Sequence, residues 1–393
     1  WRGGGALGRV HWAPDGRRLS YATSREEKSS LWVHDLDSGA TTRLGGEIDQ
    51  LGDYRWSPDG AFVVYEFSQK AEPDKRKVKR LQNLADRMPD WRERTYLALL
   101  TVPDGAVRRL TAGPWSTGNW RLSPDGGRLL FFREWPDYGA RPFSRSELWE
   151  IDLKTMAAQK ILEDPWVSAA EYGPDPGVLA LQGSPSAFDG LGRDLPAGVV
   201  PNDYGGQLYL YDRASQKATA VSRELDPDII DMQWHRHDGR IYARVYEGQR
   251  QNFYALEPKT RAWQRLDAGC EVVDSFDLAV GAPLGIALGT GAVTPQRLSL
   301  VDLKRGQSRV ILDPAAEAAA DVRYGRVENW ACKLPNGETL DGRVYYPLDF
   351  DPSRRYPCIV YYYGGTTPVG RDFAGRYPKN LWAGLGYFVY VPQ

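Results

Sequence analysis

Residues 359–365 read IVYYYGG, a strand-like apolar run that reaches Tyr363 and is followed by Gly364 and Gly365. A strand that leads into a Tyr-Gly-Gly turn can position the tyrosine hydroxyl next to a reacting oxygen. The hydroxyl can then donate a hydrogen bond to that oxygen as it gains negative charge. One such donor, fixed in advance in a water-poor cleft, stabilises a transition state by about 3–4 kcal/mol. Glycine after the tyrosine lets a carbonyl group approach the backbone closely. These three residues are therefore candidates for an oxyanion-binding turn.

The other parts of a nucleophilic site are not found in the sequence. An α/β-hydrolase needs a GxSxG nucleophile elbow with the histidine later in the chain, and no GxSxG occurs here. All four histidines precede the Tyr-Gly-Gly turn: they are His11, His34, His235 and His237. The last two flank one residue and could form a metal pair, but their place in a predicted turn favours ordinary surface residues.

The sequence also lacks the patterns that hold cofactors and metals. No Walker loop, Rossmann glycine fingerprint or HExxH motif is present. Cys270, Cys332 and Cys358 are widely spaced and form no CxxC pair, which argues against a zinc site and a disulfide framework. We expect the cysteines to be small buried hydrophobic residues. No cofactor and no metal are predicted.

The overall composition is that of an ordinary globular protein. Of 393 residues, 42% are hydrophobic and 26% are charged, and 50 Lys and Arg balance 51 Asp and Glu. This balance gives no field that would attract nucleic acid, and no apolar run approaches the roughly 18 residues of a membrane span. Because Trp1 is not an initiator methionine, we expect the natural N-terminus to be missing. The sequence therefore does not decide whether the protein is cytoplasmic, periplasmic or secreted.

A short phrase recurs along the chain with drift. HWAPDGRRLSYAT at 11–23, RWSPDGAFVVYEF at 55–67 and WRLSPDGGRLLFF at 120–132 each place a Pro-Asp-Gly turn between two strand-like runs. In this turn proline presets φ and glycine supplies a positive φ, so each copy predicts a β-hairpin. Degenerate copies follow at 170–182 and 232–244.

Each hairpin is followed by a second recurrent unit, first seen as SLWVHDLDSGATTRL at 30–44, which predicts two further strands. Four antiparallel strands in about 40–65 residues are typical of a β-propeller blade. A β-sandwich would explain the strands but not the fixed order of two hairpin types. We therefore predict an all-β propeller with six visible blades, and seven or eight in the parent protein. The six blades lie at about 8–46, 50–113, 119–164, 167–224, 229–269 and 271–314.

The second blade contains an insertion at residues 70–94. Pro73 stands near a plausible helix start, and apolar residues at 78, 81, 84 and 85 recur at helical spacing. These features predict an amphipathic helix. We interpret its basic face as a solvated surface, with a contact to another domain, a subunit or an acidic substrate as the alternative. The basic residues are Lys75, Arg76, Lys77, Lys79 and Arg80.

The composition changes after the last blade. PCIVYYY at 357–363 is nearly continuously apolar, as in a strand buried on both faces of a sheet. NLWAGLGYFVYVPQ then predicts a short helix, a glycine turn and a further strand. Strand, helix and strand are the opening of an α/β domain. We predict a β-propeller domain over 1–320 and the beginning of an α/β-hydrolase domain over 321–393.

The order of propeller, DGRVYYP, YPCIVYYYGG and GYFVYVPQ resembles the prolyl oligopeptidase family of serine peptidases, which includes dipeptidyl peptidase IV and acylaminoacyl peptidase. In that family a β-propeller caps a C-terminal α/β-hydrolase domain. The resemblance implies that Tyr363 donates a hydrogen bond to the oxyanion, with Gly364 and Gly365 forming the turn. Where relatives carry proline after the glycine pair, this sequence has Thr366, which leaves the subfamily open.

The resemblance implies a serine peptidase that hydrolyses short peptides, with a propeller that gates access to a Ser-Asp-His site beyond Gln393. The chain itself is then a fragment, and we expect it to be inactive. Two alternatives remain open: a non-enzymatic TolB-like binding propeller, and an esterase with the same lid. The sequence does not decide between a monomer and a homo-oligomer, and it does not define the cleavage specificity.

Overall fold

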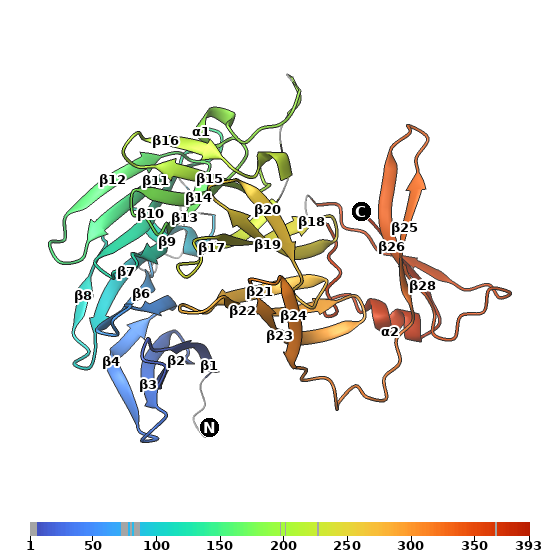
Figure 1. Ribbon diagram of the computed structural model, residues 1–393, viewed down its shortest axis with the longest axis horizontal. Coiled ribbons are helices and arrows are strands. Elements are labelled where there is room, and N and C mark those ends of the chain that lie inside the picture. The colour runs from blue at the N-terminus through green and yellow to red at the C-terminus, as the bar shows by residue number, and fades with distance from the viewer. Residues whose placement is uncertain are drawn as a thin grey trace. The chain divides into compact units, whose positions relative to one another are not determined.

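The computed structural model describes residues 6–71, 78, 81, 87–196, 198–200, 202–225, 228–365 and 368–393 (Figure 1). The chain divides into two compact units. One unit holds Trp1–Gly190 and Tyr211–Ala218, and the other holds Leu191–Leu210 and Thr219–Gln393. Strands predominate in both units.

Three four-stranded antiparallel sheets lie in the first unit, and each corresponds to one predicted blade. The strand orders are β1-β2-β3-β4, β5-β6-β7-β8 and β9-β10-β11-β12. A 3-10 turn, η2 (Pro89–Arg92), precedes β7 in the second blade. The bounds are β1 Ala6–Trp12, β2 Arg18–Arg25, β3 Lys28–Asp35, β4 Thr41–Asp49, β5 Leu51–Trp56, β6 Phe62–Gln69, β7 Arg94–Thr101, β8 Val107–Arg109, β9 Ser116–Leu122, β10 Arg128–Pro136, β11 Ser144–Asp152 and β12 Ala158–Glu163.

The fourth, fifth and sixth blades follow the same pattern. The fourth has the order β13-β14-β15-β16, and the division between the units runs through its last two strands. The fifth, β17 to β20, and the sixth, β21 to β24, are joined by one parallel bridge between Gln251 and Val272. These five sheets, the last of which holds two blades, confirm the six predicted blades. The bounds are β13 Val167–Tyr172, β14 Val178–Gly183, α1 Ala187–Gly190, β15 Gln207–Asp212, β16 Lys217–Ala220, η3 Arg223–Leu225, β17 Asp228–Trp234, β18 Ile241–Glu247, β19 Arg250–Glu257, β20 Ala262–Leu266, β21 Val272–Leu278, β22 Leu284–Gly291, β23 Thr294–Asp302 and β24 Gln307–Leu312.

Aspartate side chains close the hairpin turns that the sequence predicted. In the second blade, Oδ1 of Asp59 accepts hydrogen bonds from Oγ of Ser57 at 2.6 Å and from the N–H of Ala61 at 3.0 Å. Gly60 between them adopts a φ of 73°, which favours glycine. The serine hydroxyl and the N–H group lower the pKa of the Asp59 carboxyl. The Pro-Asp-Gly signal therefore works through a local hydrogen bond as well as through backbone conformation.

Apolar side chains pack neighbouring blades together within each unit. In the first unit, one cluster around Leu31, Tyr54 and Leu100 joins the first and second blades. In the second unit, Phe253 of the fifth blade and Phe276 of the sixth lie with their ring centroids 4.9 Å apart. The alternation of buried and exposed residues along the strands thus builds the core between the sheets.

The last part of the chain forms a separate four-stranded sheet with the order β25-β26-β28-β27. β25 (Val327–Lys333) and β26 (Thr339–Tyr345) are an antiparallel hairpin, and β28 (Phe388–Pro392) pairs antiparallel with β26. β27 (Cys358–Val360) pairs parallel with β28. The connection between the two parallel strands contains α2 (Lys379–Gly384), which packs against β28 (Figure 1). A strand, a helix and a parallel strand form the predicted α/β opening.

One prediction about this sheet is wrong: residues 357–363 are not a strand buried on both faces. β27 has only three residues, Val360 is 55% exposed and Tyr362 is 70% exposed. β27 stands last in the strand order, so that β28 is its only paired neighbour among the described residues. The apolar run does form a strand, at Cys358–Val360, but within the part of the chain that the structure describes no second strand pairs with its outer edge.

Two other predictions, the helix within 70–94 and the domain boundary at 320, stay predictions. The helix predicted within 70–94, with the basic face defined above, lies almost entirely outside the described residues. Its described part includes Val78 and Leu81, which are exposed. The domain boundary predicted at 320 falls between the end of β24 and the start of β25, and it stays a prediction. None of the described helices is long and apolar enough to cross a membrane.

Candidate functional site

Tyr363 lies just beyond β27, where the chain has left the sheet. The residue is 67% exposed, and its hydroxyl has no hydrogen-bond partner among the described residues. Its ring folds back over Gly365, where an added Cβ would lie 2.2 Å from Cε1 of the tyrosine. An added Cβ at Gly364 would meet open space. Gly365 thus accommodates the tyrosine ring, while the backbone at Gly364 is open to a ligand.

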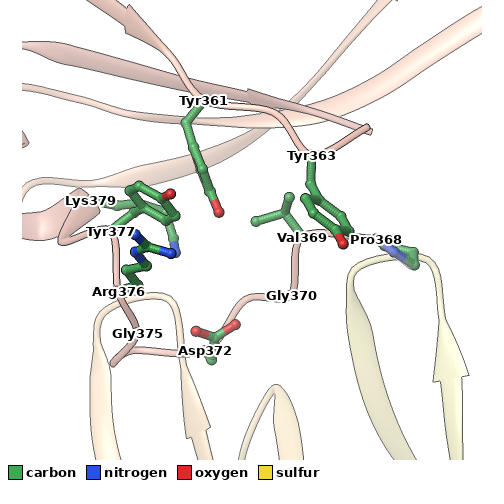
Figure 2. Close-up of a pocket in the computed structure, with 10 residues that line it drawn as sticks. All are labelled: Tyr361, Tyr363, Pro368, Val369, Gly370, Asp372, Gly375, Arg376, Tyr377 and Lys379. Atoms are coloured by element: carbon green, nitrogen blue, oxygen red, sulfur yellow. The ribbon is translucent and has the colours of Figure 1, made fainter. Parts of the chain in front are cut away.

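A cavity of about 310 Å³ opens beside Tyr363 (Figure 2). Figure 2 shows the rings of Tyr361 and Tyr363 on either side of Val369, with the carboxylate of Asp372 on the opposite wall. The walls come from the end of β27, from the segment that follows the glycine turn and from the first residue of α2. The lining residues are Tyr361, Tyr363, Pro368, Val369, Gly370, Asp372, Gly375, Arg376, Tyr377 and Lys379.

Lys379 brings a buried amino group to this cavity. The residue is only 6% exposed, and its Nζ lies 5.6 Å from the ring centroid of Tyr361. No hydrogen bond or ion pair holds Nζ within the described part of the chain. Burial lowers the pKa of Lys379, against the opposing effect of the Asp372 carboxylate. The basic groups of Lys379 and Arg376 outnumber the single carboxylate, so the cavity suits an oxygen that carries negative charge.

Arg343 of β26 supports the back of the cavity. It is fully buried, at 0% exposure. Its Nη1 donates to the carbonyl of Val369 at 2.8 Å and to Oε1 of Gln249 at 2.6 Å, while Nη2 donates to the carbonyl of Gly370. Its Nε lies 3.2 Å from the hydroxyl of Tyr345. One guanidinium group therefore fixes two successive carbonyls of the cavity wall.

Arg371 anchors the same segment from its other side. Its Nε donates to Oε1 of Glu271 at 2.9 Å, and its Nη1 donates to Oδ1 of Asn329 at 2.9 Å. Glu271 also pairs with Arg250 at 2.9 Å and accepts from the N–H of Ala292 at 2.8 Å. Burial alone would raise the pKa of Glu271, but the Ala292 N–H and the two guanidinium groups outweigh burial and lower it.

The histidines take no part in this cavity, and the prediction for one of them is wrong. His235 is not a surface residue: it is 3% exposed, its Nε2 donates to the carbonyl of Ala279 at 2.8 Å, and its Nδ1 lies 3.0 Å from Oδ1 of Asp238. The turn that follows β21 covers it. Among the described residues, no group of three or more His, Cys, Asp or Glu side chains could hold a metal ion.

The cysteines also differ from the expectation that all three are buried. Cys358 is exposed, because it lies on the edge strand β27. Cys270 and Cys332 are half-buried. Burial, aided by nearby carboxylates of which Asp274 is the strongest, raises the pKa of the Cys270 thiol to about 12. Cys270 is therefore a weak nucleophile at neutral pH.

Comparison with known proteins gives relatives over the whole chain. No protein-family model matches the chain. A dipeptidyl-peptidase 5 from Porphyromonas endodontalis is 24% identical over 413 residues of alignment, which covers 97% of this chain and 57% of that protein. A dipeptidyl-peptidase 5 from Porphyromonas gingivalis is 23% identical over 304 residues, which covers 74% of this chain and 41% of that protein. These similarities support the resemblance to the prolyl oligopeptidase family that the sequence indicated.

A solved structure is similar to this chain in fold. The acylaminoacyl peptidase of Pyrococcus horikoshii superposes with a TM-score of 0.75 at 16% identity, over 98% of this chain and 57% of that chain. The chain thus spans somewhat more than half the length of this prolyl oligopeptidase-family structure and of the relative from P. endodontalis.

Sequence reasoning named Tyr363 and its two glycines as candidates, which stays a prediction, and it missed the groups that surround them. Lys379 and Arg371 stand in a stretch that reads as a loop and a short helix, and nothing in their local pattern predicts burial. The sequence held a weak signal that Arg343 is buried. Arg343 and Tyr345 are two residues apart in one strand, so their side chains point to the same face of the sheet. Its partner Gln249 is 94 residues away in sequence, and no local pattern links the two.

Proposed function

We propose that this chain supplies the propeller and the first strands of the catalytic domain of a serine peptidase that hydrolyses short peptides, and that Tyr363 is a hydrogen-bond donor of its oxyanion hole. The observation that carries the proposal is the free, exposed hydroxyl of Tyr363 beside a cavity with two basic side chains. The dipeptidyl-peptidase names of two relatives support peptides as the substrate class.

In this proposal the Tyr363 hydroxyl acts when a serine attacks the scissile carbonyl. The carbonyl oxygen gains negative charge in the tetrahedral intermediate, and a donor already in place stabilises that charge more than it stabilises the neutral substrate. The open backbone at Gly364 leaves room for the oxygen to approach. The tyrosine ring lies against Gly365, where a side chain would displace it.

The nucleophile, its histidine and its acid are proposed to lie in sequence beyond this chain. Support comes from the missing GxSxG motif and from the greater length of the relatives, of which the alignments cover 57% or less. We further propose that the propeller, within 1–320, restricts entry to the site so that short peptides are favoured over folded proteins. The chain by itself is expected to have no peptidase activity.

A fluorophosphonate probe tests this assignment, because it reacts with activated serines. We expect the probe to label the longer protein that contains this chain, and to leave the 393-residue chain unlabelled. A peptide p-nitroanilide and a p-nitrophenyl ester, compared on the longer protein, then separate a peptidase from an esterase by their kcat/KM values. Absence of labelling and of turnover in the longer protein would indicate a binding propeller and refute the proposal.

A further inference from the structure

We propose that Arg343 is a positioning residue of the Tyr363 site, and that Gln249 in the turn between β18 and β19 is the propeller residue through which it acts. The inference rests on the proposed function, since it assigns a role in that reaction. Neither side chain lines the cavity beside Tyr363. Both act on the segment 368–372, which forms the wall facing the tyrosine.

The first argument is the way in which Gln249 holds that segment at two points. Its side-chain Oε1 accepts a hydrogen bond from Arg343 Nη1 at 2.6 Å. The same guanidinium group donates to the carbonyls of Val369 and Gly370. The main-chain carbonyl of Gln249 accepts from the N–H of Arg371 at 3.1 Å. Three consecutive residues of the wall are therefore tied, directly or through Arg343, to one turn of the fifth blade.

The second argument is the burial of the Arg343 charge. The residue is 0% exposed, and its hydrogen bonds go to a side-chain amide, two main-chain carbonyls and a hydroxyl. A buried guanidinium group needs all of these acceptors, because each one that is lost leaves a desolvated donor of a charged group. Loss of the Gln249 acceptor should therefore shift Arg343 and the two carbonyls that it holds.

The third argument is the position of the wall. Val369 stands between Tyr361 and Tyr363 in the cavity (Figure 2). Movement of this residue changes the space in which the Tyr363 ring and a bound carbonyl must meet. Small misplacements of reacting groups lower the rate of the chemical step more than they lower substrate affinity. Gln249 is thus expected to affect kcat although it does not touch the substrate.

Two substitutions at Gln249 test the inference. Gln249→Ala removes the acceptor for Arg343, whereas Gln249→Glu keeps an acceptor oxygen and adds a countercharge. Gln159→Ala is the matched control, since the amide of Gln159 donates to Glu150 at 3.0 Å within the third blade. Hydrogen–deuterium exchange of a peptide spanning 368–373 is measured on this chain, and kcat and KM for a peptide p-nitroanilide are measured on the longer protein.

We expect Gln249→Ala to raise exchange in 368–373 by about tenfold and to lower kcat by about tenfold, with KM nearly unchanged. Gln249→Glu and Gln159→Ala should stay near wild type in both measurements. Unchanged exchange in Gln249→Ala would overturn the inference whether or not the longer protein hydrolyses peptides. Faster exchange with a wild-type kcat would overturn it too. If the wild-type longer protein has no activity, the positioning role falls with the proposed function, and the exchange difference identifies a structural anchor only.

Discussion

Glu150 of the third blade is the centre of a buried charge network, and replacing it with glutamine should destabilise the first unit. The residue is 3% exposed. Its carboxylate accepts two hydrogen bonds from the guanidinium group of Arg213, at 2.9 and 2.8 Å. The hydroxyl of Tyr172 at 2.9 Å and the amide of Gln159 at 3.0 Å also donate to it, and Nη1 of the half-exposed Arg128 lies 4.0 Å from Oε2.

The magnitude follows from what Glu150→Gln leaves behind. The glutamine amide keeps one acceptor oxygen, but its NH₂ group faces a donor of Arg213, whose side chain is 16% exposed. Breaking a buried ion pair by removing one partner costs about 3–5 kcal/mol. Because Arg213 retains some contact with water, we expect the lower end, about 3 kcal/mol. Glu163→Gln is the control, because this exposed carboxylate of the same blade should change stability by less than about 0.5 kcal/mol.

Urea unfolding, monitored by circular dichroism, measures the change in the free energy of unfolding. Arg213→Met and the double variant Glu150→Gln/Arg213→Met complete a double-mutant cycle. The double variant should lose less than the sum of the single variants, since it removes both partners of the buried pair and leaves unpaired only the half-exposed Arg128. A loss for Glu150→Gln as small as that for Glu163→Gln would refute this reasoning.

The same network predicts a pH dependence with a definite sign. Burial would raise the pKa of Glu150, but the hydrogen bonds and charge of Arg213, with the Tyr172 hydroxyl, outweigh burial and lower it. A lowered carboxyl pKa contributes stability that is present above the unfolded value, about 4.3, and is lost as pH falls through the folded value. The stability difference between wild type and Glu150→Gln should therefore shrink in acid.

Three further outcomes follow from contacts near the proposed site. Arg371→Met should loosen the segment held by Glu271, and amide exchange there should rise by about tenfold or more, without unfolding the blades. Gly342→Ala should lower the thermal midpoint, because the added Cβ would lie 2.7 Å from the carbonyl of Val391; unchanged melting contradicts this. Iodoacetamide followed by mass spectrometry should modify exposed Cys358 well before Cys270.

The blades could be predicted because their signals are local. The turn between the third and fourth strands of a blade is an example. In the third blade, Oδ1 of Asp152 accepts from the N–H of Thr155 at 2.7 Å, and in the fourth blade, Oδ1 of Asp212 accepts from the N–H of Ser215 at 2.7 Å. Donor and acceptor are three residues apart, so the pattern recurs in the sequence each time the blade recurs. The parallel pairing of β27 with β28 fits the chain between them, which is long enough for a crossover.

What the sequence could not predict depends on distant partners. His235 is buried because the carbonyl of Ala279, 44 residues away, covers its ring nitrogen. The three tyrosines at 361–363 look alike in sequence, yet the ring of Tyr361 packs in a tilted arrangement against Tyr377 with centroids 4.7 Å apart, while Tyr363 is left exposed. Only the folded neighbourhood distinguishes a packing residue from a candidate donor.

The most direct test of the proposed role of Tyr363 is kcat of the Tyr363→Phe variant of the longer protein with a peptide p-nitroanilide. Tyr362→Phe is the matched control, since this adjacent tyrosine is equally exposed but does not line the cavity. We predict that Tyr363→Phe lowers kcat by about 10²–10³-fold with little change in KM, as expected for loss of one oxyanion donor. A kcat for Tyr363→Phe equal to that of Tyr362→Phe would contradict the account.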